Sequence, residues 1–250
     1  MAWTAVPANG YFLELCEKRM SQYQHAFCGE HQIPGAYCPN CRKPLLRFLT
    51  LDLSDPLLKT ELPNGTLSLL YCWTCQIAQK PFYYRCMRDG DVLLISYGLG
   101  GCTSDFPYDG YPSHFPAKFA RLISIDANTQ RSIMHQNAGS VSSSYIESDE
   151  VAIFPEGEEI PEAIEDHPEG VPREARKLAD APEHQVGGQP LLLDTYWRMR
   201  CPVCGDRMPF IASIGDASGA EKGFTDNPYV QVLYHLCLHC RAIGAYQRTD

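Results

Sequence analysis

The sequence predicts an α+β, β-rich fold made of a duplicated unit with two zinc-ribbon-like sites of four cysteines each. One observation is that Cys-x-x-Cys pairs occur four times, at Cys38 and Cys41, Cys72 and Cys75, Cys201 and Cys204, and Cys237 and Cys240. A second is that short runs of aliphatic, aromatic and β-branched residues follow or separate these pairs, as in the strands of a small sheet. A metal at the end of such a sheet stabilises strands that cannot bury enough core by themselves.

The spacing of the cysteine pairs predicts two structural Zn²⁺ ions as the cofactors. Two thiolates three positions apart fit one tight turn, and two such turns complete the four-sulfur tetrahedron of a closed zinc site. Thirty residues lie between Cys41 and Cys72, and 32 lie between Cys204 and Cys237. The predicted ligands are Cys38, Cys41, Cys72 and Cys75 in the first site, and Cys201, Cys204, Cys237 and Cys240 in the second.

The other four of the 12 cysteines are left out of the metal sites. Cys16, Cys86 and Cys102 have no cysteine three positions away. Cys28 lies ten positions before Cys38, so a ligand role for it stays open. His239 lies inside the last pair, and we expect it at the surface rather than on the metal.

Hydrophobic periodicity predicts the remaining elements. Apolar residues at near-helical spacing predict an amphipathic helix over residues 11–27. Strands are predicted over residues 45–53, 66–71, 82–86, 91–97, 119–125, 208–214, 229–236 and 242–247. A short helix over residues 172–179 begins with proline, and residues 98–116, 131–144 and 215–226 are predicted loops.

The positions around the two sites predict a duplication. Leu45 and Met208 lie four residues after Cys41 and Cys204, and similar apolar residues recur at the next core positions. We therefore expect an N-terminal half with the first zinc ribbon over residues 1–146 and an acidic, proline-containing linker over residues 147–182. The C-terminal half with the second ribbon would cover residues 183–250.

The charge of the chain is unevenly distributed. The net charge is -9, and residues 147–169 hold ten acidic residues and no Lys or Arg. Such a stretch is either a solvated linker or a docking strip for a basic partner, and it repels nucleic acid. No basic run is present, so nucleic-acid binding is not expected.

The cellular environment follows from the cysteine usage and the apolar runs. No apolar run is long enough to span a membrane, and the N-terminus lacks the pattern of a signal peptide. Cysteine-rich chains without an export signal remain in the reducing cytosol, where paired cysteines bind metal rather than form disulfides. We therefore expect a cytoplasmic protein without a membrane partner.

The sequence predicts no catalytic and no cofactor-binding residue. Four thiolates leave zinc no open position for water or substrate, and no nucleophile elbow or phosphate-binding loop is present. A redox site would have one Cys-x-x-Cys pair at a helix N-terminus rather than pairs flanking strands. The alternative that stays open is an enzyme of unrecognised type, with a site between the halves that uses residues 98–116 and 184–190.

Several longer motifs resemble a known family. They are Cys38-Pro-Asn-Cys-Arg-Lys-Pro-Leu-Leu, Leu51-Asp-Leu-Ser-Asp-Pro, Leu69-Leu-Tyr-Cys-Trp-Thr-Cys, His184-Gln-Val-Gly-Gly-Gln-Pro and Cys201-Pro-Val-Cys-Gly-Asp-Arg-Met. Together they resemble the bacterial YwqG-like family and its relatives, the programmed-cell-death-protein-2-like proteins. The resemblance spans about two thirds of the chain, and it implies a role as a dedicated chaperone for a ribosomal protein.

These observations lead to one functional expectation. The chain is expected to be a cytosolic zinc-binding protein-interaction module that acts as a chaperone or adaptor. Its partner would be a basic client protein such as a ribosomal protein.

Overall fold

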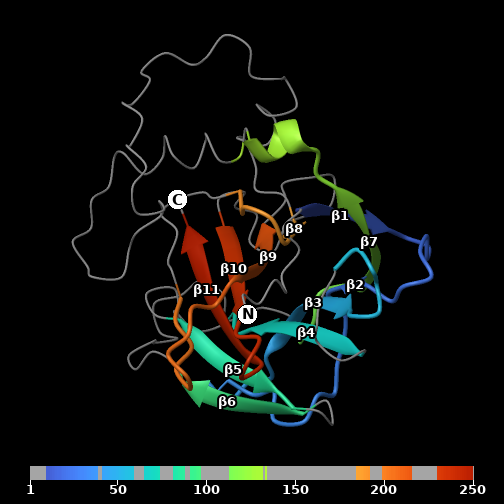
Figure 1. Ribbon diagram of the computed structural model, residues 1–250. Coiled ribbons are helices and arrows are strands. Elements are labelled where there is room, and N and C mark those ends of the chain that lie inside the picture. Colours follow the sequence, from blue (N-terminus) through green and yellow to red (C-terminus); the bar gives the residue numbers. More distant parts are fainter. Residues whose placement is uncertain are drawn as a thin grey trace, which may run out of the picture.

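Eleven strands form one antiparallel sheet in this computed structural model. The structure describes residues 10–38, 41–58, 65–73, 81–87, 91–96, 113–131, 133, 184–191, 199–215 and 230–249. The strand order is β4-β3-β2-β7-β1-β8-β9-β10-β11-β5-β6. Figure 1 shows the sheet strongly curled, with β9, β10 and β11 steeply inclined to β5 and β6.

The strands of the first half are β1 (Tyr11–Cys16), β2 (Ala26–Phe27), β3 (Leu46–Asp52), β4 (Thr66–Tyr71), β5 (Phe82–Cys86), β6 (Val92–Ser96) and β7 (Lys118–Ser124). The strands of the second half are β8 (Gln185–Val186), β9 (Phe210–Gly215), β10 (Val230–Leu236) and β11 (Ala242–Thr249). All eight predicted strands are present within two residues of their expected ends. The β-rich character of the fold is thereby confirmed.

The predicted helix over residues 11–27 is wrong. Residues Tyr11 and Leu13 are buried and Glu14 is exposed, which is the period-2 alternation of a strand with one face in the core. β1 lies between β7 and β8 and pairs with both. The helical spacing was misleading because it included Met20, which is 62% exposed and lies in the connection to β2.

Helix is scarce in the described part of the chain. Residues 127–131 and residue 133 are helical, partly where the sequence predicted a loop. Asp126 begins this turn, because its carboxylate accepts hydrogen bonds from the backbone N–H groups of Asn128 and Thr129. The predicted helix over residues 172–179 lies outside the described residues.

The sheet has the same arrangement of strands on either side of the central β1–β7 pair. On one side follow β2, β3 and β4, and on the other follow β8, β9 and β10. The registers agree as well: β2 pairs Ala26 with Thr50, and β8 pairs Gln185 with Ser213. At the centre of this arrangement Glu14 is paired with Arg121.

A bulge occurs at the same position in both halves. The β3–β4 register skips Phe48, and the β9–β10 register skips Ile211, each seven residues after the second cysteine of its pair. The carbonyl of Phe48 accepts a hydrogen bond from the Cys28 N–H, and the carbonyl of Ile211 accepts one from the Gly187 N–H, each at 2.9 Å. The two hairpins therefore share their register, their bulge and the contact that satisfies it.

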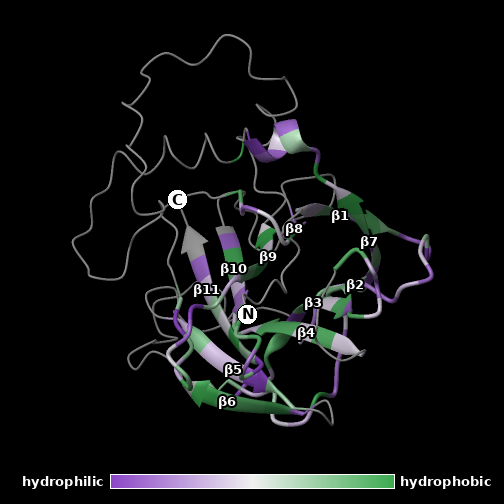
Figure 2. Ribbon diagram, viewed as in Figure 1, coloured by the Kyte–Doolittle hydropathy of each residue, from purple (hydrophilic) through white to green (hydrophobic). Residues whose placement is uncertain are grey.

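The main core lies inside the curl and draws on both halves of the chain. Its largest fully buried side chains include Phe48 and Trp73 from the first half and Tyr234 from the second. Figure 2 shows hydrophobic residues along β6, β7 and β9. A smaller cluster around Met199, Met208 and Tyr246 lies beside the second cysteine site and packs on Tyr83 and Ile95.

The edge strand β4 is covered by side chains of β5. The hydroxyl of Tyr84 accepts a hydrogen bond from the Leu70 backbone N–H at 2.7 Å and donates to the Ser68 carbonyl at 3.3 Å. A side chain thus satisfies backbone groups that a neighbouring strand would otherwise satisfy. This contact holds the curled sheet closed.

Candidate metal centres

The first cysteine cluster lies where β3 begins and β4 ends. Cys38 and Cys41 come from the turn before β3, and Cys72 directly follows β4. Their sulfur atoms all lie within 4.8 Å of one another, and the Sγ atoms of Cys41 and Cys72 are 3.7 Å apart. Cys75, the fourth predicted ligand, lies outside the described residues.

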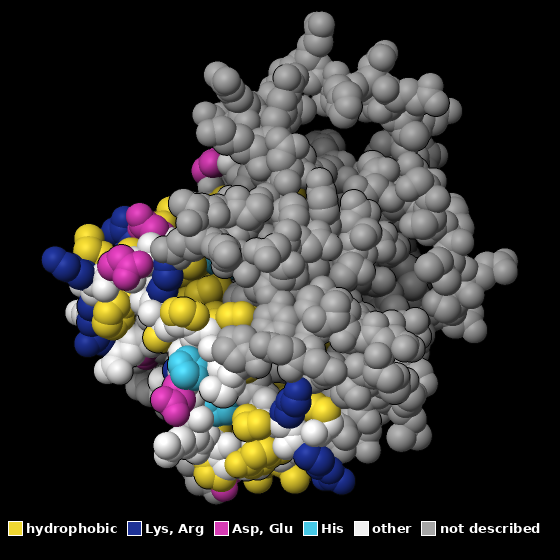
Figure 3. Space-filling model, turned by 180° about the vertical axis from the view of Figure 1, so that it is seen from behind, with side chains coloured by type: hydrophobic (Ala, Val, Ile, Leu, Met, Phe, Trp, Pro, Cys, Tyr) yellow, Lys and Arg dark blue, Asp and Glu magenta, His cyan; other side chains and the backbone are white. Residues whose placement is uncertain are grey.

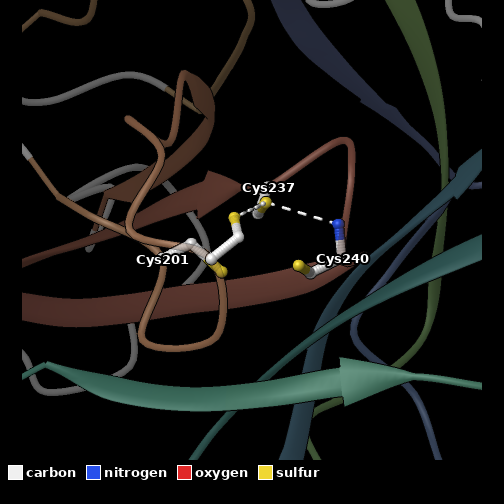
Figure 4. Close-up of side chains that lie close together, drawn as sticks. Cys201, Cys237 and Cys240 are labelled. Carbon is white, nitrogen blue, oxygen red and sulfur yellow. Dashed lines mark hydrogen bonds between the residues drawn. The ribbon is translucent and has the colours of Figure 1, made fainter.

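The second cluster is complete in the described part of the chain. Cys201, Cys204, Cys237 and Cys240 present sulfur atoms within 4.8 Å of one another. Figure 4 shows the sulfur atoms of Cys201, Cys237 and Cys240 turned toward a common centre. The Sγ atoms of Cys204 and Cys237 are 3.6 Å apart. The structure therefore brings together seven of the eight predicted ligand residues in two groups.

These distances fit a shared metal and exclude disulfides. A disulfide has an S–S distance of about 2.05 Å, and all the described cysteines are free. Tetrahedral zinc with Zn–S bonds of about 2.3 Å places its sulfur ligands about 3.8 Å apart. The closest contacts of 3.7 Å and 3.6 Å lie near that value.

The turn at Cys38 and the turn at Cys201 have the same backbone hydrogen bonds. The N–H of Arg42 donates to the Cys38 carbonyl, and the N–H of Gly205 donates to the Cys201 carbonyl, each at 2.9 Å. The residue after the second cysteine has positive φ in both turns, 64° at Arg42 and 77° at Gly205. Arg241, after Cys240, has a φ of 56°. Glycine adopts this conformation readily, whereas the residue type gives no signal for it at the two arginines.

The turns also direct N–H groups at sulfur. The backbone N–H of Val203 points at Cys201 Sγ and that of Cys240 at Cys237 Sγ, each at 3.4 Å. Donors of this kind stabilise thiolates, which are the form of cysteine that binds metal. In each described pair the first cysteine is fully buried and the second is more accessible. The arrangement holds sulfur rigidly and is suited to a closed structural site.

The cysteines outside these clusters do not join them. Cys28 is fully buried, and burial raises the pKa of its thiol. Burial also raises the pKa of Cys86 to about 12, so both thiols stay protonated at neutral pH. In the described residues neither lies in a group that could hold a metal, and neither does Cys16. Cys102 lies outside the described residues.

The motif that begins at His184 is a structural turn. Gln185 donates through Nε2 to the carbonyls of Gly187 and Gln189, and its Oε1 accepts from the N–H of Leu191. A Cβ on Gly188 would lie 2.6 Å from the backbone of Gly10, which explains the need for glycine. The polar atoms of the Gln185 side chain are thus used within the turn, and most of residues 98–116 lie outside the described chain.

Sequence reasoning missed a buried pair that stabilises the first half. His25 Nδ1 accepts a hydrogen bond from the Asp52 N–H, so Nε2 carries the proton and donates to Asp55 Oδ2 at 2.8 Å. Both side chains are almost fully buried. The residues 25–29 align with residues 184–188, and comparing these two segments would have drawn attention to His25. The pair links β2 to the turn after β3, and its role is structural.

Two further predictions concern other parts of the chain. The acidic residues 147–169 lie outside the described residues. Among the residues that the structure describes, we find no helix with the length and hydrophobicity needed to span a bilayer.

Fold and site together define a β-rich protein with a curled antiparallel sheet and two cysteine clusters suited to metal. Comparison with known proteins found no matching family model, no curated protein and no solved structure with significant similarity.

Proposed function

We propose that the chain is a cytoplasmic protein-interaction module held together by two structural zinc ions, and that it acts as a chaperone or adaptor for a basic client. The observation that carries the metal part is the convergence of cysteines at both sites, with contacts of 3.7 Å and 3.6 Å. The client part rests on the acidic residues 147–169 and on the resemblance to the YwqG-like and programmed-cell-death-protein-2-like proteins.

Zinc is the metal that this set of ligands favours. Four thiolates form a soft, tetrahedral site, and zinc occupies such sites in reducing compartments. Cys75 would complete the first site, as Cys240 completes the second. Arg42, Lys43, Arg207 and Arg241 lie next to the cysteines and would offset the charge of about -2 on each zinc–thiolate group.

The metal proposal is tested by elemental analysis of the untagged protein. We expect about two zinc ions per chain, about one after Cys201→Ser and about two after Cys16→Ser, because Cys16 lies outside both clusters. Unchanged zinc after Cys201→Ser, or metal-free protein with intact thiols, would contradict the proposal.

The matching registers support a duplication of the whole β1–β4 unit. In this proposal β7 to β10 form the second copy, so the copy begins at Lys118 rather than at the expected boundary at residue 183. The acidic residues 147–169 then form part of an insertion between β7 and β8. Hydrogen bonds recur across the copies: Ala120 donates to the His25 carbonyl and Leu13 donates to the His184 carbonyl.

The acidic residues offer the complementary charge for a basic client. Ten acidic residues without a basic one attract a cationic surface and speed its encounter at low salt. The client class is a basic protein such as a ribosomal protein, and nucleic acid is repelled by the same charge.

The client proposal is tested by capture of a purified basic ribosomal protein at low and high salt. We expect capture to weaken at least tenfold when the ten acidic residues of 147–169 become Gln and Asn. A variant with the same residues in shuffled order keeps the charge and should keep most of the capture. Equal capture by the neutralised variant would exclude this stretch as the docking site.

A further inference from the structure

The face of β7 that carries Phe119 exposes large hydrophobic side chains near the middle of the sheet. Phe119 is 44% exposed and Ile123 is 40% exposed. Residues two apart on a strand lie on the same face, so Phe119, Arg121 and Ile123 point to one side. Cys16 pairs with Phe119 and lies on that side too. We call these four residues the Phe119 face.

The matching position on β1 shows how such a face is covered. Phe12 pairs with Gln185 as Phe119 pairs with Ala26, so Phe12 and Phe119 occupy equivalent positions. Phe12 packs against Ile125, Ile133 and Leu191 in a small apolar cluster. Its cover therefore consists of apolar side chains from a short helix and from the turn after β8.

The residues that would provide the same cover over Phe119 are polar. Register places Lys18 at the position of Ile125, and Gln32 at the position of Leu191. Ile125 and Leu191 are buried, whereas Lys18 and Gln32 are exposed. Two apolar covering residues are thus replaced by polar ones, while the aromatic residue beneath them is retained.

The charge around the Phe119 face is opposite to that of the whole chain. Residues 11–24 and 118–124 contain four basic and two acidic residues, although the chain as a whole carries a net charge of -9. Arg121 pairs with Glu14, and Lys118 pairs with Glu17 at 3.4 Å. Lys18 and Arg19 have no acidic partner among the described residues, so both are available to an acidic ligand.

Figure 3 shows this side of the molecule at the left, where hydrophobic side chains lie between basic and acidic ones. Exposed aromatic and aliphatic side chains rimmed by charge are typical of protein interaction sites. The matching cover over Phe12 includes Ile133, which is helical. The positive charges of Lys18 and Arg19 favour an acidic occupant. We propose that the Phe119 face binds an acidic amphipathic helix of a partner protein.

Such a helix supplies the apolar cover that the described residues do not give to Phe119. Aliphatic residues on one of its faces replace the cover that Ile133 and Leu191 give to Phe12. Acidic residues beside them meet Lys18 and Arg19. Binding of this helix involves Phe119, Lys18 and Arg19, so it does not depend on the capture of a basic client through residues 147–169.

The test uses the full-length, zinc-loaded chain and three fluorescein-labelled helical peptides of about 14 residues. The first carries Leu and Ile at helical spacing with Glu elsewhere, the second has Lys in place of Glu, and the third has Ser in place of Leu and Ile. We expect only the first peptide to bind in fluorescence anisotropy. Phe119→Ser, and separately Lys18→Glu with Arg19→Glu, should weaken that binding at least tenfold.

Matched controls separate this face from general stickiness. Leu93→Ser removes an apolar side chain that is 52% exposed on β6, and Arg131→Glu reverses an exposed charge on the short helix. Neither should change the affinity. The proposal is overturned if the acidic peptide binds no better than the other two, or if the Phe119 and charge-reversal variants bind it as well as the wild type does.

A second copy of the chain is the competing occupant. In analytical ultracentrifugation without peptide, the wild type and the Phe119→Ser variant should have the same sedimentation coefficient. A wild-type dimer that becomes monomeric in this variant would assign the face to self-association and overturn the proposal.

Discussion

At the scale of single residues, buried polar groups make hydrogen bonds whose loss would destabilise the fold. His25 and Asp55 illustrate this, because each of their described hydrogen bonds stays inside the protein. A carboxylate buried to this extent requires its donor, since removing the donor leaves an uncompensated charge.

The His25–Asp55 contact predicts a large effect of one substitution. His25→Ala should lower the free energy of unfolding by about 3 kcal/mol, because Asp55 loses its donor in a buried site. Asp55→Asn should cost about 1 kcal/mol, since an oxygen acceptor remains. Urea unfolding measures both, with His114→Ala as an exposed control. Equal stability of His25→Ala and the control would contradict this assignment.

His184 predicts a pH dependence. Burial lowers the pKa of His184 to about 4, from an ordinary value of 6.5. Between these values the unfolded chain binds a proton that the folded protein does not. The free energy of unfolding is therefore not lowered by His184 above pH 6.5. Between pH 6.5 and pH 4 it falls by about 1.4 kcal/mol per pH unit as the unfolded chain binds the proton.

The measurement is urea unfolding between pH 5 and pH 7, with the zinc content followed in parallel. His184→Gln should reduce the slope of unfolding free energy against pH by about 1.4 kcal/mol per unit. His114→Gln, at an exposed position, should leave the slope as it is in the wild type. Identical slopes for wild type and His184→Gln would show that His184 titrates normally.

At the scale of elements, the cysteine turns dictate backbone conformation after their second cysteine. Arg42 and Arg241 adopt the left-handed conformation that costs a residue with Cβ about 1–2 kcal/mol, whereas glycine fills the same position after Cys204. The geometry of the cysteine turns overrides the preference of the arginine residues.

These positions predict opposite effects of exchanging glycine and alanine. Arg42→Gly should be more stable than Arg42→Ala by about 1 kcal/mol, and Gly205→Ala should be less stable than the wild type by a similar amount. A Cβ at residue 205 meets nothing within 4 Å, so the second effect is purely conformational. Thermal unfolding of the zinc-loaded variants measures both, and Gly205→Ala with wild-type stability would contradict the argument.

At the scale of the whole molecule, the sheet connects the two halves at more than one place. β1 pairs with β8, and β5 pairs with β11. The main core contains Phe48 from β3 and Ile214 from β9. A disturbance in one half therefore reaches the other through shared strands and shared core.

This connection predicts one cooperative unit of unfolding. Cys201→Ser removes a ligand from a site of a kind that contributes on the order of 10 kcal/mol, comparable to the stability of a typical domain. Hydrogen exchange of β3 and β9 should accelerate together, because they share the core. Cys16→Ser serves as the control and should change neither strand. Loss of protection in β9 with full protection in β3 would instead indicate independent halves.

The sequence alone determined eight of the eleven strands and the pairing of cysteines within the described turns, because both depend on short-range pattern. Period-2 alternation marks a strand, and two sulfurs three residues apart mark a metal turn. The same reasoning failed over residues 11–27, where an accidental helical spacing continued past the strand β1 into the connection to β2.

The tertiary structure alone decided how distant segments meet. It brought β1 between β7 and β8, placed His25 against Asp55 and placed the Phe119 face at a position whose counterpart is covered. These features depend on contacts between residues tens of positions apart, which no local period encodes. The long-range register of the sheet is the physical reason that they became visible only in the folded chain.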